Sequence, residues 1–372
     1  MVKRVLFLIP NLAHGGAERV LVNLANNLNK TKFEVTVQTL FDVGVNRQYL
    51  QNHVHYISGF KYYFRGNSQL MKMIPSKWLY RMIIKDEYDI VVSYLEGPTA
   101  RIVAACPNRN TKKISWIHVE LSTPKLAAIG FINHRKAQQA YNQFDRIIAV
   151  SEQVKKVFQK NMPTTAPVEV LYNTNETEII LEKSESTDVS PVFKTGDIPV
   201  ICSVAKLAQT KGFDRLLNVH KKLIDEGYNH RIYLLGIGEM QQELEKKISK
   251  YKVQDSFILL GFQDNPYKYV SKCDLYVCSS RREGFSTAVT EALIVGVPVI
   301  STDCSGAKEL LGENNEYGIV VENSEEGIYT GIKCCLGNSE LLAYYKKQAK
   351  GRGQFFSREK TVKAVEEMLL KL

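Results

Sequence analysis

Several features of membrane-embedded and disulfide-stabilised proteins are missing from this sequence of 372 residues. No segment approaches the roughly 20 uninterrupted apolar residues of a membrane-spanning helix. Residues 1–10 hold an apolar run of only about five residues with no small-residue cleavage site after it, so they predict a buried first strand rather than a signal peptide. The seven cysteines are odd in number and scattered, without a Cys-x-x-Cys pair. They favour a reducing compartment over a disulfide framework.

Two further absences narrow the possible functions. Gly236-Ile-Gly238 has Gln241 in place of a third glycine, and the sequence has no Gly-x-Gly-x-x-Gly, which counts against an NAD-dependent enzyme. No nucleic-acid-binding signature accompanies the net charge of +10, so nucleic acid is not an expected partner. The charge is uneven, with 23 Lys and Arg against 11 Asp and Glu up to Asn173, and 26 against 28 afterwards. We expect the basic first half to meet an anionic partner, such as a phosphate-bearing substrate or a membrane surface.

Strand-like and helical segments alternate through both halves of the chain. Short β-branched runs separated by helical patterns predict parallel sheets with helices on both faces, and so two doubly wound α/β domains. The expected strands are Val5–Ile9, Phe33–Thr39, Ile90–Tyr94, Lys113–Ile117, Arg146–Val150 and Val168–Leu171 in the first half, and Val200–Val204, Arg231–Leu235, Ser256–Leu260, Leu275–Cys278 and Pro298–Ser301 in the second.

A polar segment marks the boundary between the halves. Residues 176–197 are rich in Thr, Ser, Glu and Lys and break the alternation. We therefore expect an N-terminal domain over residues 1–175, a linker over 176–197 and a second domain over 198–355. Residues 356–372 predict an amphipathic helix that crosses back to the N-terminal domain. Two such domains usually place an active site in the cleft between them.

The segment from Ser279 to Leu293 carries the strongest functional signal. It follows a predicted strand and opens a helix, and open α/β sheets bind ligands at the carboxyl ends of their strands. Ser286 and Thr287 are candidate N-cap residues, and the N–H groups of a helix start bind a diphosphate. Glu283 precedes the helix and Glu291 lies within it, so both carboxylates can face a ligand. At this spacing alone, a helix cap and a solvated surface charge would be the simpler interpretation.

The pattern Glu283-x7-Glu291-Ala-Leu-x-x-Gly-x-Pro resembles the signature of retaining glycosyltransferases of family 4. The resemblance covers nearly the whole chain and implies a GT-B fold, in which two Rossmann-like domains face a central cleft. It implies that Glu283 acts as a catalytic residue by contacting the sugar of a nucleotide-sugar donor. It also implies that Glu291 binds the ribose. Further donor contacts implied for this chain are Gly284 and Phe285 at the sugar, Ser286 and Thr287 at the diphosphate, and Gly261 and Phe262 near the base.

Three more segments are similar to the family pattern. The Gly15-Gly16 pair makes an anion-binding turn, and in the family such a pair lies against the donor phosphates or the acceptor. Lys206 and Lys211 match two cations that neutralise the diphosphate leaving group, although the family more often has Arg at the first position. His118, at a predicted strand end, matches a histidine that faces the donor sugar and is assigned as catalytic. A lone histidine in such a place is otherwise usually structural.

The sequence has no Asp-x-Asp pair, with which metal-dependent transferases hold a divalent cation on the diphosphate. We therefore expect no cofactor and no obligatory metal. The expected reaction is transfer of a hexose or N-acetylhexosamine from a nucleotide diphosphate sugar. UDP is the nucleotide that the family uses most often. Front-face substitution, in which the acceptor attacks from the side that the diphosphate leaves, would retain the anomeric configuration.

Aromatic and basic residues alternate between Phe60 and Arg81, which suits an anionic membrane interface. An ordinary basic surface with half-buried aromatics is the alternative. We expect a cytoplasmic enzyme, peripheral on the inner face of the membrane, that acts on a glycan or lipid-linked acceptor in surface polysaccharide biosynthesis. Two other functions stay open: a non-catalytic nucleotide-sugar-binding subunit, and a GT-B-like enzyme of another reaction, such as an epimerase or a phosphorylase.

Overall fold

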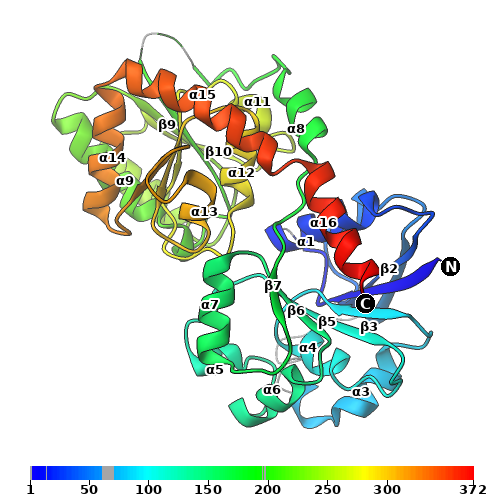
Figure 1. Cartoon of the computed structure of the whole chain (residues 1–372). Coiled ribbons are helices and arrows are strands. Elements are labelled where there is room, and N and C mark those ends of the chain that lie inside the picture. Colours follow the sequence, from blue (N-terminus) through cyan, green and yellow to red (C-terminus); the bar gives the residue numbers. More distant parts are fainter. Residues whose placement is uncertain (1, 14, 61–70, 195, 197) are drawn as a thin grey trace. The chain divides into compact units, whose positions relative to one another are not determined.

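The computed structural model divides into two compact units, each built on its own parallel sheet (Figure 1). Unit 1 comprises Met1–Asn175 and Arg358–Leu372, and unit 2 comprises Glu176–Ser357. The structure describes residues 2–13, 15–60, 71–194, 196 and 198–372.

The sheet of unit 1 has seven parallel strands in its described part, in the order β3-β2-β1-β4-β5-β6-β7. Its central strand β1 is a continuous apolar run over residues 5–9, all fully buried, because helices cover both faces of the sheet. The order reverses between β1 and β4, the switch point where open α/β sheets bind ligands. The strands are β1 (Lys3–Ile9), β2 (Phe33–Phe41), β3 (His55–Phe60), β4 (Ile90–Ser93), β5 (Lys112–Ile117), β6 (Arg146–Ala149) and β7 (Val168–Val170).

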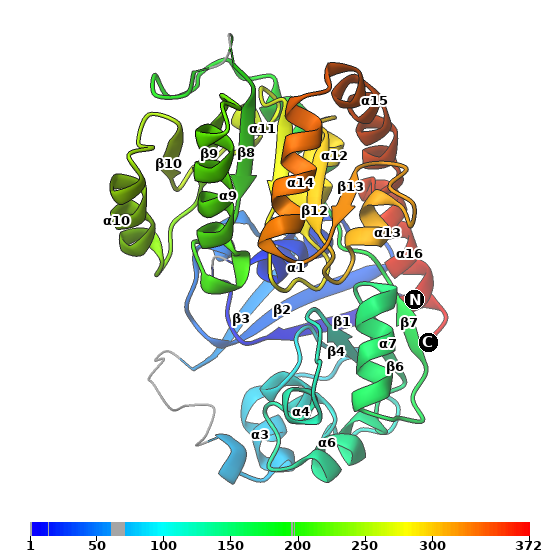
Figure 2. The same cartoon turned by 90° about the vertical axis from the view of Figure 1, so that its left-hand side faces the viewer.

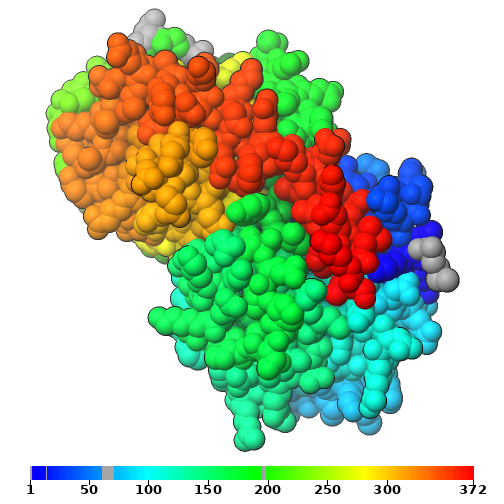
Figure 3. All heavy atoms as spheres, viewed as in Figure 1, coloured from blue at the N-terminus to red at the C-terminus, as the bar shows by residue number. Residues whose placement is uncertain are grey.

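The last helix, α16 (Arg358–Leu370), belongs to unit 1 although all of unit 2 precedes it in the sequence. The Nζ of Lys3 donates to the carbonyl of Leu369 (3.0 Å), and the backbone N–H of Asn29 donates to Oε1 of Glu366 (2.8 Å). Figures 1 and 2 accordingly show the end of α16 beside the start of β1, and Figure 3 shows its red atoms against blue atoms of unit 1. The other helices of unit 1 are α1 (Gly16–Asn27), α3 (Ser76–Ile83), α4 (Pro98–Val103), α5 (Pro124–Ala127), α6 (His134–Tyr141) and α7 (Glu152–Asn161).

The sheet of unit 2 has six parallel strands in its described part, in the order β10-β9-β8-β11-β12-β13. Its order reverses between β8 and β11, so the loops that follow these two strands lie side by side. This reversal places the segments that carry the glutamate pair and the two lysines at one switch point. The strands are β8 (Val200–Val204), β9 (Arg231–Leu235), β10 (Phe257–Gly261), β11 (Leu275–Cys278), β12 (Val299–Thr302) and β13 (Ile319–Val321).

Helices pack on both faces of the second sheet. On one face, Phe213 and Leu217 of α9, Leu244 of α10 and Ile328 of α14 join strand residues in one buried core. On the other, Phe285 packs edge-to-face against Phe356, with ring centroids 5.5 Å apart. The helices of unit 2 are α8 (Thr177–Ser184), α9 (Phe213–Asp225), α10 (Gln241–Tyr251), α11 (Tyr267–Val270), α12 (Thr287–Ile294), α13 (Ala307–Leu311), α14 (Glu325–Leu336) and α15 (Ser339–Phe355).

The predicted fold class is confirmed: both units are parallel-sheet α/β structures. The sequence analysis did not include β3 and β13. Both are edge strands whose residues are at best half-buried. Polar residues and a glycine interrupt β3, and β13 is apolar but only three residues long. Residues 176–197, expected as a linker, contain α8 and lie in unit 2. Among the described residues, no helix is both long and apolar enough to cross a bilayer.

Candidate functional site

The loop between β11 and α12 is held against the start of α9. Strand β11 is fully buried, and Ser279 and Ser280 after it are buried as well. The Oγ of Ser279 donates to the carbonyl of Lys211 (2.9 Å), and the backbone N–H of Arg281 donates to the carbonyl of Thr210 (2.7 Å). These bonds join the loops that follow β8 and β11, as their positions at the switch point require.

Glu283 and Lys211 form an ion pair in this loop. The Nζ of Lys211 lies 2.6 Å from Oε1 of Glu283, and the Oγ of Ser280 donates to the same oxygen at 2.6 Å. The side chains are only 13% exposed for Glu283 and 25% for Lys211. Burial lowers the pKa of Lys211, but the carboxylate of Glu283 outweighs it, so the pKa is raised and the lysine stays charged. The pair therefore presents one fixed cation and one fixed carboxylate at a strand end.

Gly212 allows the two loops to approach this closely. Its φ is +67°, and a Cβ on it would lie 2.1 Å from the carbonyl oxygen of Ser279. The same carbonyl accepts from Nη2 of Arg215 (2.7 Å). Arg281 forms a two-pronged ion pair with Asp214, each Nη to Oδ distance being 2.7 Å. These contacts fix the backbone on both sides of Lys211 and Glu283.

The rest of the glutamate motif lies in α12. Ser286 is the N-cap, and its Oγ accepts from the backbone N–H of Val289 (3.3 Å). Glu291 is half-buried, and the hydroxyl of Tyr267 lies 3.4 Å from its Oε1. Glu291 is therefore not the solvated surface charge of the simpler interpretation. Phe285 is buried in the core, so only its backbone is available to a ligand at this loop.

The remaining residues predicted in unit 2 are more exposed. Lys206 pairs with Glu239 (3.2 Å), and both side chains are more than half exposed. Gly261 ends β10 with φ at +69°, and nothing lies within 4 Å of where its Cβ would be. Phe262 beside it is also more than half exposed. The structure thus joins Glu283 to Lys211 and places Lys206 in a separate, exposed ion pair.

In unit 1, His118 follows β5 and is buried. Its ring centroid lies 4.7 Å from that of Tyr94, which follows β4, and its Nε2 has no hydrogen-bond partner among the described residues. Burial lowers its pKa to about 3, so the ring is neutral at physiological pH. Its backbone N–H donates to Oε2 of Glu96 (3.1 Å), a residue absent from the predicted site. Burial, with a smaller contribution from Glu18, raises the pKa of Glu96 to about 6.

The Gly15-Gly16 turn lies at the start of α1 and is covered by an acidic side chain. A Cβ on Gly15 would lie 1.9 Å from Oε2 of Glu18, so the glycine makes room for that carboxylate. Burial raises the pKa of Glu18. A carboxylate at a helix start interacts favourably with the same N–H groups that would bind a phosphate. The position assigned to a phosphate is therefore one where an acidic side chain already lies.

The sequence analysis did not identify Ser280, Arg215, Glu18 or Glu96. Glu18 and Glu96 could have been found, because each follows a predicted strand of the first sheet at its carboxyl end. Ser280 and Arg215 could not have been identified from the sequence. The contact of Arg215 joins residues more than 60 positions apart, and that of Ser280 depends on the orientation of its side chain.

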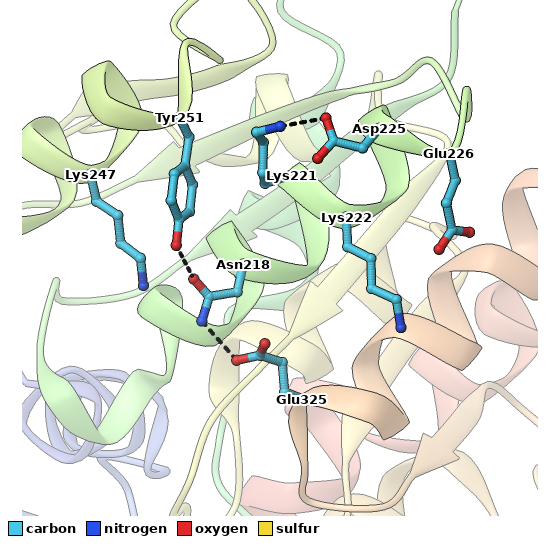
Figure 4. A pocket seen from close by; sticks show the side chains of 8 residues that line it. All are labelled: Asn218, Lys221, Lys222, Asp225, Glu226, Lys247, Tyr251 and Glu325. Atoms are coloured by element: carbon cyan, nitrogen blue, oxygen red, sulfur yellow. Dashed lines mark hydrogen bonds and ion pairs between the residues drawn. The ribbon is translucent and has the colours of Figure 1, made fainter.

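A depression on unit 2, formed by α9, α10 and α14, contains none of the predicted site residues (Figure 4). The hydroxyl of Tyr251 donates to Asn218 (3.1 Å), which donates to Glu325 (2.8 Å). Lys221 pairs with Asp225. Because the cations and carboxylates of this depression neutralise one another, we interpret the depression as a solvated polar face. Its lining residues are Asn218, Lys221, Lys222, Asp225, Glu226, Lys247, Tyr251 and Glu325.

Two family models match the chain, one in each half. The model described as Glycosyltransferase Family 4 matches residues 14–178, and that described as Glycosyl transferases group 1 matches residues 186–352. A relative from Campylobacter jejuni, named N-acetylgalactosamine-N,N'-diacetylbacillosaminyl-diphospho-undecaprenol 4-alpha-N-acetylgalactosaminyltransferase, is 27% identical over 97% of this chain and 98% of its own. The capsular polysaccharide biosynthesis glycosyltransferase CapM of Staphylococcus aureus is 26% identical over 48% of each chain.

Among solved structures, Anabaena Alr3699/HepE in complex with UDP has a TM-score of 0.77 at 19% identity, over 99% of this chain and 100% of that one. The same protein has also been solved with UDP-glucose. At this identity the likeness shows the fold, which is GT-B. With a family model matched in each half and relatives aligned over nearly its full length, this chain belongs to glycosyltransferase family 4 and is a glycosyltransferase with relatives in capsular and other polysaccharide biosynthesis.

Proposed function

We propose that this protein is a retaining, metal-independent glycosyltransferase. It would move a hexose or N-acetylhexosamine from a UDP-sugar to a glycan or lipid-linked acceptor in surface polysaccharide biosynthesis. The observation that carries the donor site is the Lys211–Glu283 ion pair at the switch point of unit 2. The nucleotide is suggested by the UDP complexes of Alr3699/HepE, and a lipid-linked acceptor by the diphospho-undecaprenol in the name of the Campylobacter relative.

The two residues of this ion pair would bind different parts of the donor. In this proposal, Lys211 meets the diphosphate, whose negative charge grows as it departs, and a fixed cation stabilises that charge most in the transition state. The helix start after Ser286 contributes backbone N–H groups to the same anion. Lys206 would add a further phosphate contact. The Gly15-Gly16 turn, which the carboxylate of Glu18 covers, would lie against the acceptor instead. The carboxylate of Glu283 would accept hydrogen bonds from hydroxyls of the donor sugar, and Glu291 from those of the ribose.

The chemical step needs no protein nucleophile in this scheme. The bond between C1 of the sugar and the diphosphate oxygen breaks as the acceptor oxygen bonds to C1 on the same face. The acceptor's hydroxyl proton passes to the departing diphosphate oxygen. His118, neutral because it is buried, would contact the donor sugar without carrying charge. NMR of the product would reveal an anomeric configuration matching that of the donor, and an inverted product would refute this step.

Donor binding and slow donor hydrolysis, measured for a panel of nucleotide sugars in EDTA, test the class of enzyme. Saturable binding of one UDP-sugar is expected, weakened about tenfold to a hundredfold by Lys211→Met because a charged contact to phosphate is lost. Glu283→Gln should abolish sugar release while UDP still binds. Glu226→Gln, in an exposed pair with Lys333, is the matched control and should change neither. Binding without turnover, even with acceptor present, would favour the non-catalytic subunit instead.

We further propose that unit 1 binds an anionic membrane surface through α3. Trp78 and Met82 lie one turn apart on its exposed side, at 66% and 50% exposure, and Met73 before it is 82% exposed. Lys77 and Arg81 alternate with them, the arrangement of an interfacial helix. Aromatic residues 62–64, which contributed to this prediction, lie outside the described residues.

Vesicle flotation tests the membrane proposal. The protein should float with vesicles containing phosphatidylglycerol at low salt, and less so at high salt or with phosphatidylcholine alone. A Met73→Ser, Trp78→Ser, Met82→Ser variant should stay at the bottom of the gradient. Tyr344→Ser removes an exposed aromatic from unit 2, with the same exposed fraction as Met82, and should float like the wild type. Equal flotation of both variants would remove α3 from the proposal.

A further inference from the structure

We propose that Glu96, together with Glu18, binds hydroxyls of the acceptor sugar in unit 1 and selects a neutral sugar over an anionic one. This inference rests on the proposed transferase function and specifies its acceptor. It concerns two carboxylates that the donor site does not use. The donor sugar carries the same kind of ring hydroxyls as an acceptor sugar, so the experiment must distinguish binding of the donor from binding of the acceptor.

The two carboxylates flank the switch point of the first sheet. Glu18 lies in the first turn of α1, after β1, and Glu96 lies between β4 and α4. Strands β1 and β4 are neighbours, and the strand order reverses between them. Glu18 and Glu96 are close enough for the charge of one to raise the pKa of the other. Switch points are where sheets of this class bind ligands, so the location itself is expected to be occupied.

A buried ring nitrogen without a hydrogen-bond partner among the described residues belongs to the next residue in this cluster, His118. Glu96 accepts from the backbone N–H of His118, so the loops after β4 and β5 are joined at this point. His118 is 7% exposed, and its Nε2 has no hydrogen-bond partner among the residues described. A buried polar atom left unpaired is destabilising, so its presence calls for an explanation, such as a ligand that binds it. A sugar hydroxyl, either of the donor as proposed above or of an acceptor ring beside it, would satisfy it, because a hydroxyl can both donate and accept.

The charge of the cluster formed by Glu18, Glu96 and His118 determines which sugars can bind there. Carboxylates accept strongly from hydroxyls, and a buried neutral histidine adds a further polar contact without adding positive charge. Among the described residues, the titratable groups that interact with Glu96 are Glu18 on α1, His118 after β5 and Tyr141 on α6, and none of these three is cationic at neutral pH. A uronic acid or sugar phosphate would bring a third negative charge into a half-buried site, which is costly. The sugar bound here should therefore carry no negative charge.

Ligand binding at pH 7.5 tests this without knowledge of the natural acceptor. We would titrate 4-nitrophenyl glycosides of glucose, N-acetylglucosamine and N-acetylgalactosamine, with 4-nitrophenyl glucuronide as the anionic match, into the full chain saturated with UDP. Saturation-transfer NMR reports binding. At least one neutral glycoside should bind and the glucuronide should not. Glu96→Gln should weaken the neutral glycoside about tenfold or more, as expected for a lost charged hydrogen bond.

Two further variants complete the experiment. Glu18→Gln removes one of the two negative charges, so the difference in affinity between the glucoside and the glucuronide should become smaller. Glu34→Gln, an exposed carboxylate on β2 paired with Arg4, is the control and should match the wild type. Thermal unfolding of each variant checks that the unit is folded, and an unfolded Glu96→Gln would be replaced by Glu96→Asp, which keeps the charge and should retain the discrimination.

The result can overturn the proposal in three ways: no neutral glycoside binds the UDP-saturated protein, the glucuronide binds as well as the glucoside, or Glu96→Gln weakens UDP-sugar binding instead of glycoside binding. The last outcome would mean that Glu96 and its neighbours bind the donor sugar and not the acceptor. If the wild type binds neither UDP nor any UDP-sugar, the transferase proposal itself fails, which is a different result.

Discussion

At the scale of single residues, the ion pair between Lys211 and Glu283 determines how the donor site behaves. Its side chains are mostly buried, so each charge depends on the other for compensation. Among the described residues, the hydroxyl of Ser280 is the other hydrogen-bond donor to this carboxylate. Removing one partner should therefore cost stability as well as function, and removing both should cost less than the two losses together.

A double-mutant cycle on unfolding in urea measures this dependence. Lys211→Met should lower the free energy of unfolding by about 2 kcal/mol, less than for a fully buried pair because the lysine is a quarter exposed. Adding Glu283→Gln should recover part of the loss, giving a coupling energy of about 1–2 kcal/mol. Strictly additive losses would mean that the two side chains do not depend on each other in solution.

Gly212 should tolerate no side chain. Its positive φ costs an L-residue about 1–2 kcal/mol, and the new Cβ would also meet the carbonyl of Ser279 at 2.1 Å. Gly212→Ala should therefore lower stability by more than 2 kcal/mol and weaken donor binding, because the loops carrying Lys211 and Glu283 must separate. Gly227→Ala is the matched control, with positive φ but nothing within 4 Å, and should show the backbone cost alone.

At the scale of secondary-structure elements, a buried pair of histidines joins α9 to the segment before β9. Nδ1 of His220 lies 2.9 Å from Nε2 of His230, and Nε2 of His220 lies 2.9 Å from the Oγ of Ser256. Burial, with a smaller effect of His230, lowers the pKa of His220 to about 3. Burial also lowers the pKa of His230. Both rings are therefore neutral in the folded protein.

This pair should make unit 2 sensitive to acid. In the unfolded chain the histidines take up protons below about pH 6.5, and in the folded protein they do not, so stability falls as the pH drops below that value. From pH 8 to pH 5 the loss from His220 should be about 2 kcal/mol, and His230 should add to it in the same direction. Urea unfolding across this range measures it. His220→Asn should be less stable at pH 8 but show a shallower decline, whereas the exposed His55→Asn should keep the wild-type decline.

The elements also show how far the sequence could predict this structure. Inner strands such as β1 and β11 were found because they are buried on both faces and so read as apolar runs. Edge strand β3 was missed because polar residues and a glycine interrupt it, and edge strand β13 because its apolar run is only three residues long. Glu283, Glu291 and Lys211 were proposed as site residues from the strand–loop–helix context and from the resemblance to family 4. The contacts of Lys211 with Glu283 and of Tyr267 with Glu291 could not be predicted, because pairing depends on which strands are neighbours.

At the scale of the whole molecule, α16 should be necessary for the stability of unit 1. Its buried apolar side chains each contribute about 1.5–3 kcal/mol, and Lys3 and Asn29 bond to it directly. These buried residues are Val362, Val365, Met368 and Leu369. A chain that stops at Ser357 should lose protection of β1 and β2 in hydrogen exchange, while β8 and β11 keep theirs. Glu366→Gln alone should cause only a small change. Equal loss in both sheets would mean that the units unfold together.

The return of α16 to the first sheet also has a consequence for synthesis on the ribosome. The strands of unit 1 leave the ribosome first, but the helix that completes this unit is made only after every residue of unit 2. Domains generally fold as units as they emerge, and exposed apolar surface in the meantime favours aggregation. Unit 2 can therefore finish folding while the apolar surface of unit 1 that α16 covers is still exposed to solvent. Unit 1 is translated before unit 2, but its fold is completed after that of unit 2.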